Sequence, residues 1–197
     1  MEKTKLYKHT VDAEIAQKLL TINEIYAEAE LGLDTFYAIN WNNHRTGYTK
    51  IPTHVAYLAF INFKNFIIEI SKLLKDSTGE YYNLFSLARF IARNKHDYNI
   101  DNKIINELIS DLRKNQRESI DIILKMRNKR FAHTDEDYQT IKSHIGNSET
   151  SVLLSIVKKI IDHLNETVKI NPEKKYLRMK GIGHADFWDD VYIKMLV

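Results

Sequence analysis

Apolar residues recur three or four positions apart along most of the chain, which is the period of an α-helix buried on one face. The clearest stripes cover Ala59–Leu74, Ile104–Leu112 and Leu153–Leu164. The chain has only six Gly and two Pro, so the turn residues of a many-stranded sheet are missing. The pattern predicts an all-α protein, a bundle of four to five long helices with short accessory helices.

Capping and breaking residues divide this pattern into elements. A first helix is expected to start near Thr10 or Asp12 and to end at Leu31, with Gly32 as the residue just beyond it. Pro52 is expected to open the longest helix at its first turn. The aromatic residues of that helix are expected in the core: Phe60, Phe63 and Phe66.

Later boundaries follow from the same signals. Asp101 is expected to cap a helix that bends near Asn115 and continues to Ala132. The other expected elements are a short piece over Asp34–Asn42, a polar loop over Asn43–Ile51, helices over Tyr81–Asn94 and Glu149–Val168, and a loop or short helical segment over Thr134–Asn147.

One domain is expected, followed by a tail. The helical bundle should cover residues 1–170, and residues 171–197 should form a helical tail that packs on the bundle or on a partner. The boundary is set by Pro172, which cannot continue the preceding helix.

Composition narrows the class of protein. The 197 residues include 29 Lys and Arg against 26 Asp and Glu, and the absence of Cys excludes disulfides and thiol catalysis. No apolar run approaches the roughly 18 residues of a membrane span, and the first residues lack the apolar core of a secretory signal. We therefore expect a soluble, cytoplasmic protein with no membrane partner.

Positive charge is concentrated in one segment. Residues 111–130 contain seven Lys or Arg and three Asp or Glu, a net charge of +4, which exceeds the +3 of the whole chain. Such a run can be a solvated helix face. It can also be an anion site, most naturally for a phosphate backbone.

Arg127 and His133 lie within or next to this segment and could carry chemistry. Arg127 falls four residues after Ile123, on or near the apolar stripe, where a guanidinium needs an anionic or polar partner. The ordinary pKa of a histidine side chain lies close to neutrality, so His133 could transfer protons. An Arg that holds phosphate and a His that moves protons are enough for metal-free RNA cleavage, because the ribose 2′-hydroxyl is the nucleophile.

An Arg followed by four to six residues and then a His occurs three times in the chain. The pairs are Arg89 with His96, Arg127 with His133, and Arg178 with His184. Only in the second does Asn follow the Arg and Ala precede the His, so this context selects Arg127 and His133.

The segment Arg127–Asp135, which reads Arg-Asn-Lys-Arg-Phe-Ala-His-Thr-Asp, resembles the HEPN superfamily, and within it the abortive-infection (Abi) branch. The expected helix over Tyr57–Asp76 and the stretch Leu84–Leu87 are similar more loosely, and the resemblance covers roughly residues 5–170. It implies a HEPN-like bundle. It also implies a metal-independent endoribonuclease without a cofactor, which leaves 2′,3′-cyclic phosphate ends and acts as a toxin or antiviral effector.

The resemblance also implies roles and partners. His133 would transfer protons, Arg127 would stabilise the transition state, and Asn128 would orient the site, while Lys129 and Arg130 could hold flanking RNA. The partners would be RNA, a second copy in a homodimer, and an antitoxin or activator protein.

A geometric condition applies to the Arg127–His133 pair. On a straight helix the two side chains would point about 120° apart. They can converge only if the helix ends or deforms near Phe131–Ala132, or if two subunits bring their motifs together.

Two other classes of function stay open. The chain could be a non-catalytic helical module that binds RNA, a nucleotide or a partner protein, or a plain dimerisation domain. In the binding module, the Arg127 cluster would be only an anion or interface site. A further alternative for Arg127 and His133 is a buried ion pair with a carboxylate of another helix.

Overall fold

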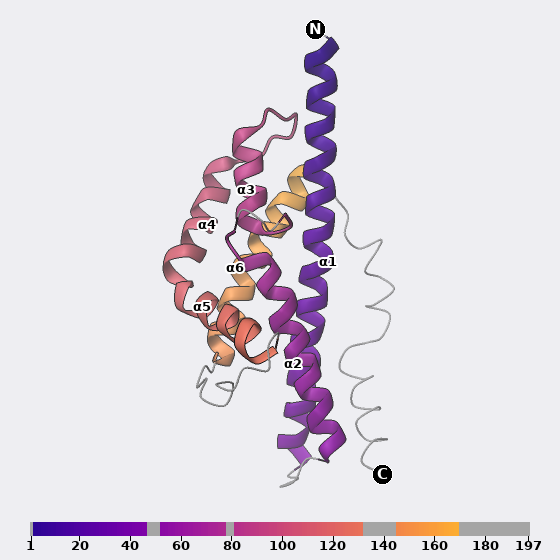
Figure 1. Cartoon of the computed structure of the whole chain (residues 1–197), viewed down its shortest axis with the longest axis vertical. Coiled ribbons are helices and arrows are strands. Elements are labelled where there is room, and N and C mark those ends of the chain that lie inside the picture. Colours follow the sequence, from indigo (N-terminus) through magenta and orange to yellow (C-terminus); the bar gives the residue numbers. More distant parts are fainter. Residues whose placement is uncertain (1, 47–51, 78–80, 132–144, 170–197) are drawn as a thin grey trace.

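The protein is described here by a computed structural model, which covers residues 2–46, 52–77, 81–131 and 145–169. Every regular element in these ranges is a helix, so the all-α prediction is confirmed (Figure 1). The elements are α1 (Glu2–Thr46), α2 (Thr53–Leu74), α3 (Leu84–Arg93), α4 (Asn102–Asn115), α5 (Arg117–Lys125), the π-helix η1 (Met126–Phe131) and α6 (Asn147–Val168).

The long helix α1 runs along one side of the molecule, and α2 lies antiparallel to it over its C-terminal half (Figure 1). Helices α3, α4 and α5 form the opposite side, and α6 lies between them and α1 (Figure 1). Apolar side chains from all of these helices form the main buried core, because each amphipathic stripe needs a partner to cover it. Its members include Ile15, Ile22, Phe66, Ile70, Leu87, Leu112, Ile123, Met126, Val157 and Ile160.

Gly32 lies inside α1, so the expectation that it follows the end of the first helix is wrong. A Cβ at this position would lie 2.8 Å from the carbonyl oxygen of Asn62 and 3.1 Å from the backbone nitrogen of Phe66, both on α2. Real Cβ atoms essentially never approach another atom within 3.0 Å. Glycine is therefore the residue that lets the backbones of α1 and α2 meet closely.

The other boundaries of α1 also differ from the sequence expectation. The helix starts at Glu2, before Thr10, and runs on to Thr46 through the piece expected over Asp34–Asn42 and the first part of the expected loop. One glycine costs a helix only about 1 kcal/mol. Burial of residues such as Ala29, Leu33 and Ile39 on either side of the glycine offsets that cost.

Three expectations about α2 are also wrong. The longest helix is α1, and Pro52 lies one residue before α2, as its N-cap, where its carbonyl oxygen accepts hydrogen bonds from Val55 and Ala56 at 2.9 and 3.0 Å. Phe60 was expected in the core, but its side chain is 41% exposed. Phe66 is buried and Phe63 packs on the core as expected. Phe60 differs because it faces η1 at the edge of the apolar stripe.

The boundaries that depend on local capping agree better with the sequence. The Asp101 carboxylate accepts a hydrogen bond from the Lys103 backbone at 2.8 Å and caps α4. The expected bend occurs at Gln116, between α4 and α5. Helix α6 ends at Val168 as expected, while α3 starts at Leu84, three residues later than expected, because Asn83 caps it.

Lys18 of α1 is a buried cation, and its burial was not predicted from the sequence. Its side chain is 2% exposed, and Nζ lies 3.6 Å from the Glu14 carboxylate and over the Tyr81 ring. Burial lowers the pKa of Lys18, and the neighbouring Glu14 offsets only part of that effect. The Tyr81 hydroxyl donates a hydrogen bond to Glu14, which raises the pKa of Tyr81 to about 12. The cluster attaches the connection between α2 and α3 to α1.

A buried pair of amides joins α1 to α6. Asn23 Nδ2 donates to Asn165 Oδ1 at 2.8 Å, and Asn165 Nδ2 donates back to Asn23 Oδ1 at 2.8 Å. Asn23 Nδ2 also donates to the Leu19 carbonyl at 2.8 Å. Because buried polar groups are costly when unpaired, this reciprocal arrangement satisfies both side chains.

Several expectations fall outside the described residues. These are the tail over 171–197, most of the loop over Thr134–Asn147 and the end of the helix expected at Ala132. Among the described helices, none is long and apolar enough to cross a membrane.

We expect Gly32→Ala to lower the free energy of unfolding by about 1–3 kcal/mol, because the added methyl group overpacks the α1–α2 contact. Urea denaturation measures this. Glu28, exposed on the same helix, gives the control, since Glu28→Ala should be more stable than Glu28→Gly by about 1 kcal/mol. If Gly32→Ala raises stability instead, the backbones of α1 and α2 do not meet closely at Gly32.

Candidate functional site

The helix that carries Arg127 changes its winding at the start of the motif. Regular α5 ends at Lys125, and Met126–Phe131 form a single π-helical segment. The Met126 N–H donates to the carbonyls of both Ile122 and Ile123 at this junction. π-Helical turns are rare and are frequent at functional sites. The helix is thus deformed from Met126 to Phe131. A deformation near Phe131 is one of the conditions under which the side chains of Arg127 and His133 could converge.

Two apolar side chains hold η1 on the bundle. Met126 is 2% exposed and belongs to the core, and the Phe131 ring lies 5.8 Å from the Phe60 ring of α2, centroid to centroid, in an edge-on arrangement. The turn is therefore fixed at its first and last residues. The polar residues between them are presented on a supported segment of backbone.

Arg127 is half-buried next to Met126, as its spacing from Ile123 indicated. Within the described part of the chain, no carboxylate forms a hydrogen bond or an ion pair with Arg127. A guanidinium that is partly removed from water, with no counter-charge among the described residues, favours the binding of an anion.

The other site residues fall on or after the same turn. Asn128 and Lys129 are exposed, and Arg130 belongs to η1. His133 lies outside the described residues. The structure therefore brings Arg127 together with Asn128, Lys129 and Arg130 on one helical turn, and the convergence of Arg127 with His133 stays a prediction.

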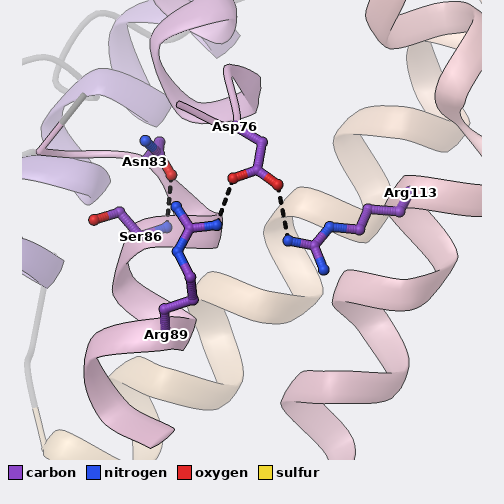
Figure 2. A network of polar contacts seen from close by, with 5 residues as sticks. All are labelled: Asp76, Asn83, Ser86, Arg89 and Arg113. Carbon is purple, nitrogen blue, oxygen red and sulfur yellow. Dashed lines mark hydrogen bonds and ion pairs between the residues drawn. The ribbon is translucent and has the colours of Figure 1, made fainter. Parts of the chain in front are cut away.

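Arg89, the first residue of a second Arg–His match, has a structural role instead. Its Nη1 lies 2.5 Å from Oδ1 of Asp76, and Nη2 of Arg113 lies 2.8 Å from Oδ2 of the same carboxylate. Figure 2 shows Asp76 bridging the two guanidinium groups. The bridge ties the end of α2 to α3 and α4, so Arg89 already has its counter-charge. The third match, Arg178 with His184, lies outside the described residues.

The two arginines set the charge state of Asp76. Burial alone would raise the pKa of this carboxyl group, but the hydrogen bonds and positive charges of Arg89 and Arg113 outweigh it and hold the pKa below its ordinary value. Asp76 is therefore ionised in the folded protein at neutral pH.

Sequence reasoning missed the aromatic face beside η1. Tyr57 is 61% exposed, and Phe60, three residues later on the same face of α2, is exposed too. The sequence signal that could have indicated their exposure is that Tyr57 and Phe60 fall outside the buried series Val55, Ala59 and Phe66. In the described ranges, no group of three His, Asp or Glu side chains could hold a metal ion.

Asp76→Asn is expected to lower the free energy of unfolding at pH 7 by about 1 kcal/mol, because the partly exposed bridge loses its charge. The pKa of Asp76 is lower in the folded than in the unfolded chain, so the stabilisation is complete above the unfolded value, about 4, and is lost as the pH falls through the folded value. Denaturation from pH 7 to pH 2 should show the difference between wild type and variant shrinking below about pH 4.

Asp162 supplies the control for this experiment, since it pairs with a single cation, Lys158, one helical turn away. Asp162→Asn should cost only about 0.3–0.5 kcal/mol at pH 7. Equal losses for the two variants would show that the Asp76 bridge adds nothing beyond an ordinary surface pair.

Arg127→Ala is expected to leave the free energy of unfolding within about 0.5 kcal/mol of wild type, because no described carboxylate depends on it. Arg89→Ala, which breaks the bridge to Asp76, should cost about 1 kcal/mol. Urea denaturation at pH 7 compares the two. A larger loss for Arg127→Ala than for Arg89→Ala would identify Arg127 as part of a structural ion pair.

Comparison with known proteins does not assign a function to this chain. No protein-family model, curated protein or solved structure matches the chain. Any function must therefore be argued from the residues and geometry described above.

Proposed function

We propose that this protein is a HEPN-type, metal-independent endoribonuclease that acts as a toxin or abortive-infection effector. The observation that carries the proposal is Arg127, a half-buried guanidinium on a π-helical turn, without a carboxylate partner in the described residues. Exposed Asn128 and Lys129 flank it. The all-α architecture agrees with the proposal, and the HEPN-like arrangement of the bundle is part of it.

The chemistry needs few groups because RNA supplies its own nucleophile. The 2′-oxygen attacks the adjacent phosphorus and loses its proton, while the bond from phosphorus to the 5′-oxygen breaks and that oxygen gains a proton. The products are a 2′,3′-cyclic phosphate and a 5′-hydroxyl. His133 transfers a proton in this step, and no metal is required.

Charge on the phosphate rises in the transition state, and this is where Arg127 acts. A guanidinium offers several N–H donors in a fixed plane that matches two phosphate oxygens. Such preorganised donors stabilise developing charge in a partly dry site. Asn128 orients the site by hydrogen bonding, and Lys129 and Arg130 hold the flanking phosphates.

A homodimer would solve the geometric problem of the motif. If Arg127 and His133 diverge within one chain, a second copy can bring its own pair into a shared cleft. An antitoxin or activator protein would restrain the nuclease in the cell. Residues 1–170 would form the bundle, and residues 171–197 would pack on it or on the partner.

The alternative is a helical module that binds RNA, a nucleotide or a partner protein without cleaving anything. One observation favours it: exposed Lys125 and Lys129 lie on either side of Arg127, and a cationic surface of this kind suffices for binding.

RNA cleavage in excess EDTA tests the proposal. Wild type should cleave and leave cyclic phosphate ends, and Arg127→Ala and His133→Ala should each lose at least about 100-fold in rate. Arg117→Ala is the matched control, because it removes an exposed Arg from the same helical segment, ten residues before the motif. It should cleave like wild type.

Two outcomes would contradict the nuclease. Equal cleavage by all four proteins would point to a contaminating enzyme. RNA binding by wild type without cleavage would favour the binding module.

A further inference from the structure

We propose that Tyr57 and Phe60, here called the aromatic platform, stack on unpaired bases and make single-stranded RNA the substrate of the Arg127 site. The inference rests on the proposed function for the role of that site. It goes further by assigning specificity to residues outside the Arg–His motif, on a different helix.

The exposure of the aromatic platform is unusual for this core. Tyr57 is the most exposed large hydrophobic side chain in the described residues. Phe60 follows three positions later, so both rings lie on one face of α2. The α2 backbone at Asn62 and Phe66 contacts α1 near Gly32, some 120–160° around the helix from Phe60. Packing against α1 therefore leaves the platform facing outward.

The platform adjoins the turn that carries the motif. Phe60 touches Phe131, the last residue of η1, ring edge against ring. Arg127 and Lys129 lie two to four positions before Phe131 on that turn. A strand of nucleic acid lying along η1 would thus have cations for its phosphates and aromatic rings for its bases.

The local charge fits a polyanion. Residues 53–68 of α2 contain no Asp or Glu. Residues 122–131 contain none either, and they include Lys125, Arg127, Lys129 and Arg130. Exposed Lys125 and Lys129 have no ion pair within the described ranges. Aromatic rings set among unpaired cations are the usual means of binding single-stranded nucleic acid.

Stacking on the platform selects for unpaired bases. Bases in a duplex are stacked on each other and cannot present their faces to a side chain. Every base has such a face, so the platform should bind single-stranded DNA as well as RNA. Only RNA has the 2′-hydroxyl that cleavage needs. Single-stranded DNA should therefore compete for the site without being cut.

Binding is best measured in the full chain with His133→Ala as the parent, so that no substrate is consumed. Fluorescence anisotropy would compare a labelled RNA of about ten unpaired nucleotides with the same strand in a duplex. Tyr57→Ala and Tyr57→Leu should each raise the Kd for the single strand about tenfold. Tyr57→Phe, which keeps the ring, should stay within about twofold of the parent, and the Kd for the duplex should not change.

Tyr82 provides a matched aromatic control. It is partly exposed like Phe60 but follows the C-terminal end of α2, which lies about 25 Å along the helix from Tyr57. Tyr82→Ala should bind the single strand as the parent does.

The outcomes separate this inference from the proposed nuclease. If wild type cleaves RNA but Tyr57→Ala binds the single strand like the parent, the inference is overturned and the nuclease stands. If wild type cleaves nothing but Tyr57→Ala still weakens single-strand binding about tenfold, the platform stands without the nuclease.

Three further results would overturn the inference. The first is that Tyr57→Leu keeps the parent's affinity, which would mean apolar contact without stacking. The parent protein could fail to bind single strands at all. Tyr57→Ala could convert a dimer to a monomer in sedimentation without changing RNA affinity per protomer, which would make the platform an interface between copies.

Discussion

The close approach of α1 and α2 at Gly32 is the contact on which the rest of the structure depends. It lets two long helices lie with backbone against backbone, where any side chain at residue 32 would collide with Asn62 and Phe66. That contact sets which face of α2 is buried and which is open. The open face carries Tyr57 and Phe60, and Phe60 in turn receives Phe131 at the end of η1. The position of the Arg127 turn thus follows from packing that begins on a different pair of helices.

Features of the fold that depend on local chemistry could be predicted from the sequence. The all-α class, the Asp101 cap, the bend before Arg117 and the end of α6 at Val168 follow from spacing and capping, which neighbouring residues decide. Gly32 could not be interpreted in this way. A glycine after an apolar stripe suits a helix end and a close helix crossing equally well, and only the partner helix distinguishes them.

In the candidate site, too, the features set by local sequence could be predicted and those set by distant contacts could not. The spacing from Ile123 placed Arg127 at the edge of the buried stripe, and the structure agrees. The π-helical winding had no signal in the sequence. The Asp76 bridge joins residues from three segments far apart in sequence, so no local pattern could reveal it. In the sequence alone, only the neighbouring residues distinguish Arg89 from Arg127.

The reciprocal amide pair of Asn23 and Asn165 has a consequence for how many arrangements the bundle can adopt. The apolar stripe of α6 repeats with every turn, so a slide of one turn along α1, about 5.4 Å, would still bury hydrophobic surface. After such a slide each amide would lose its partner, and an unsatisfied buried polar group costs about 1–3 kcal/mol. The pair therefore penalises every register of α6 but one. It gives the bundle a specificity that hydrophobic packing alone does not supply.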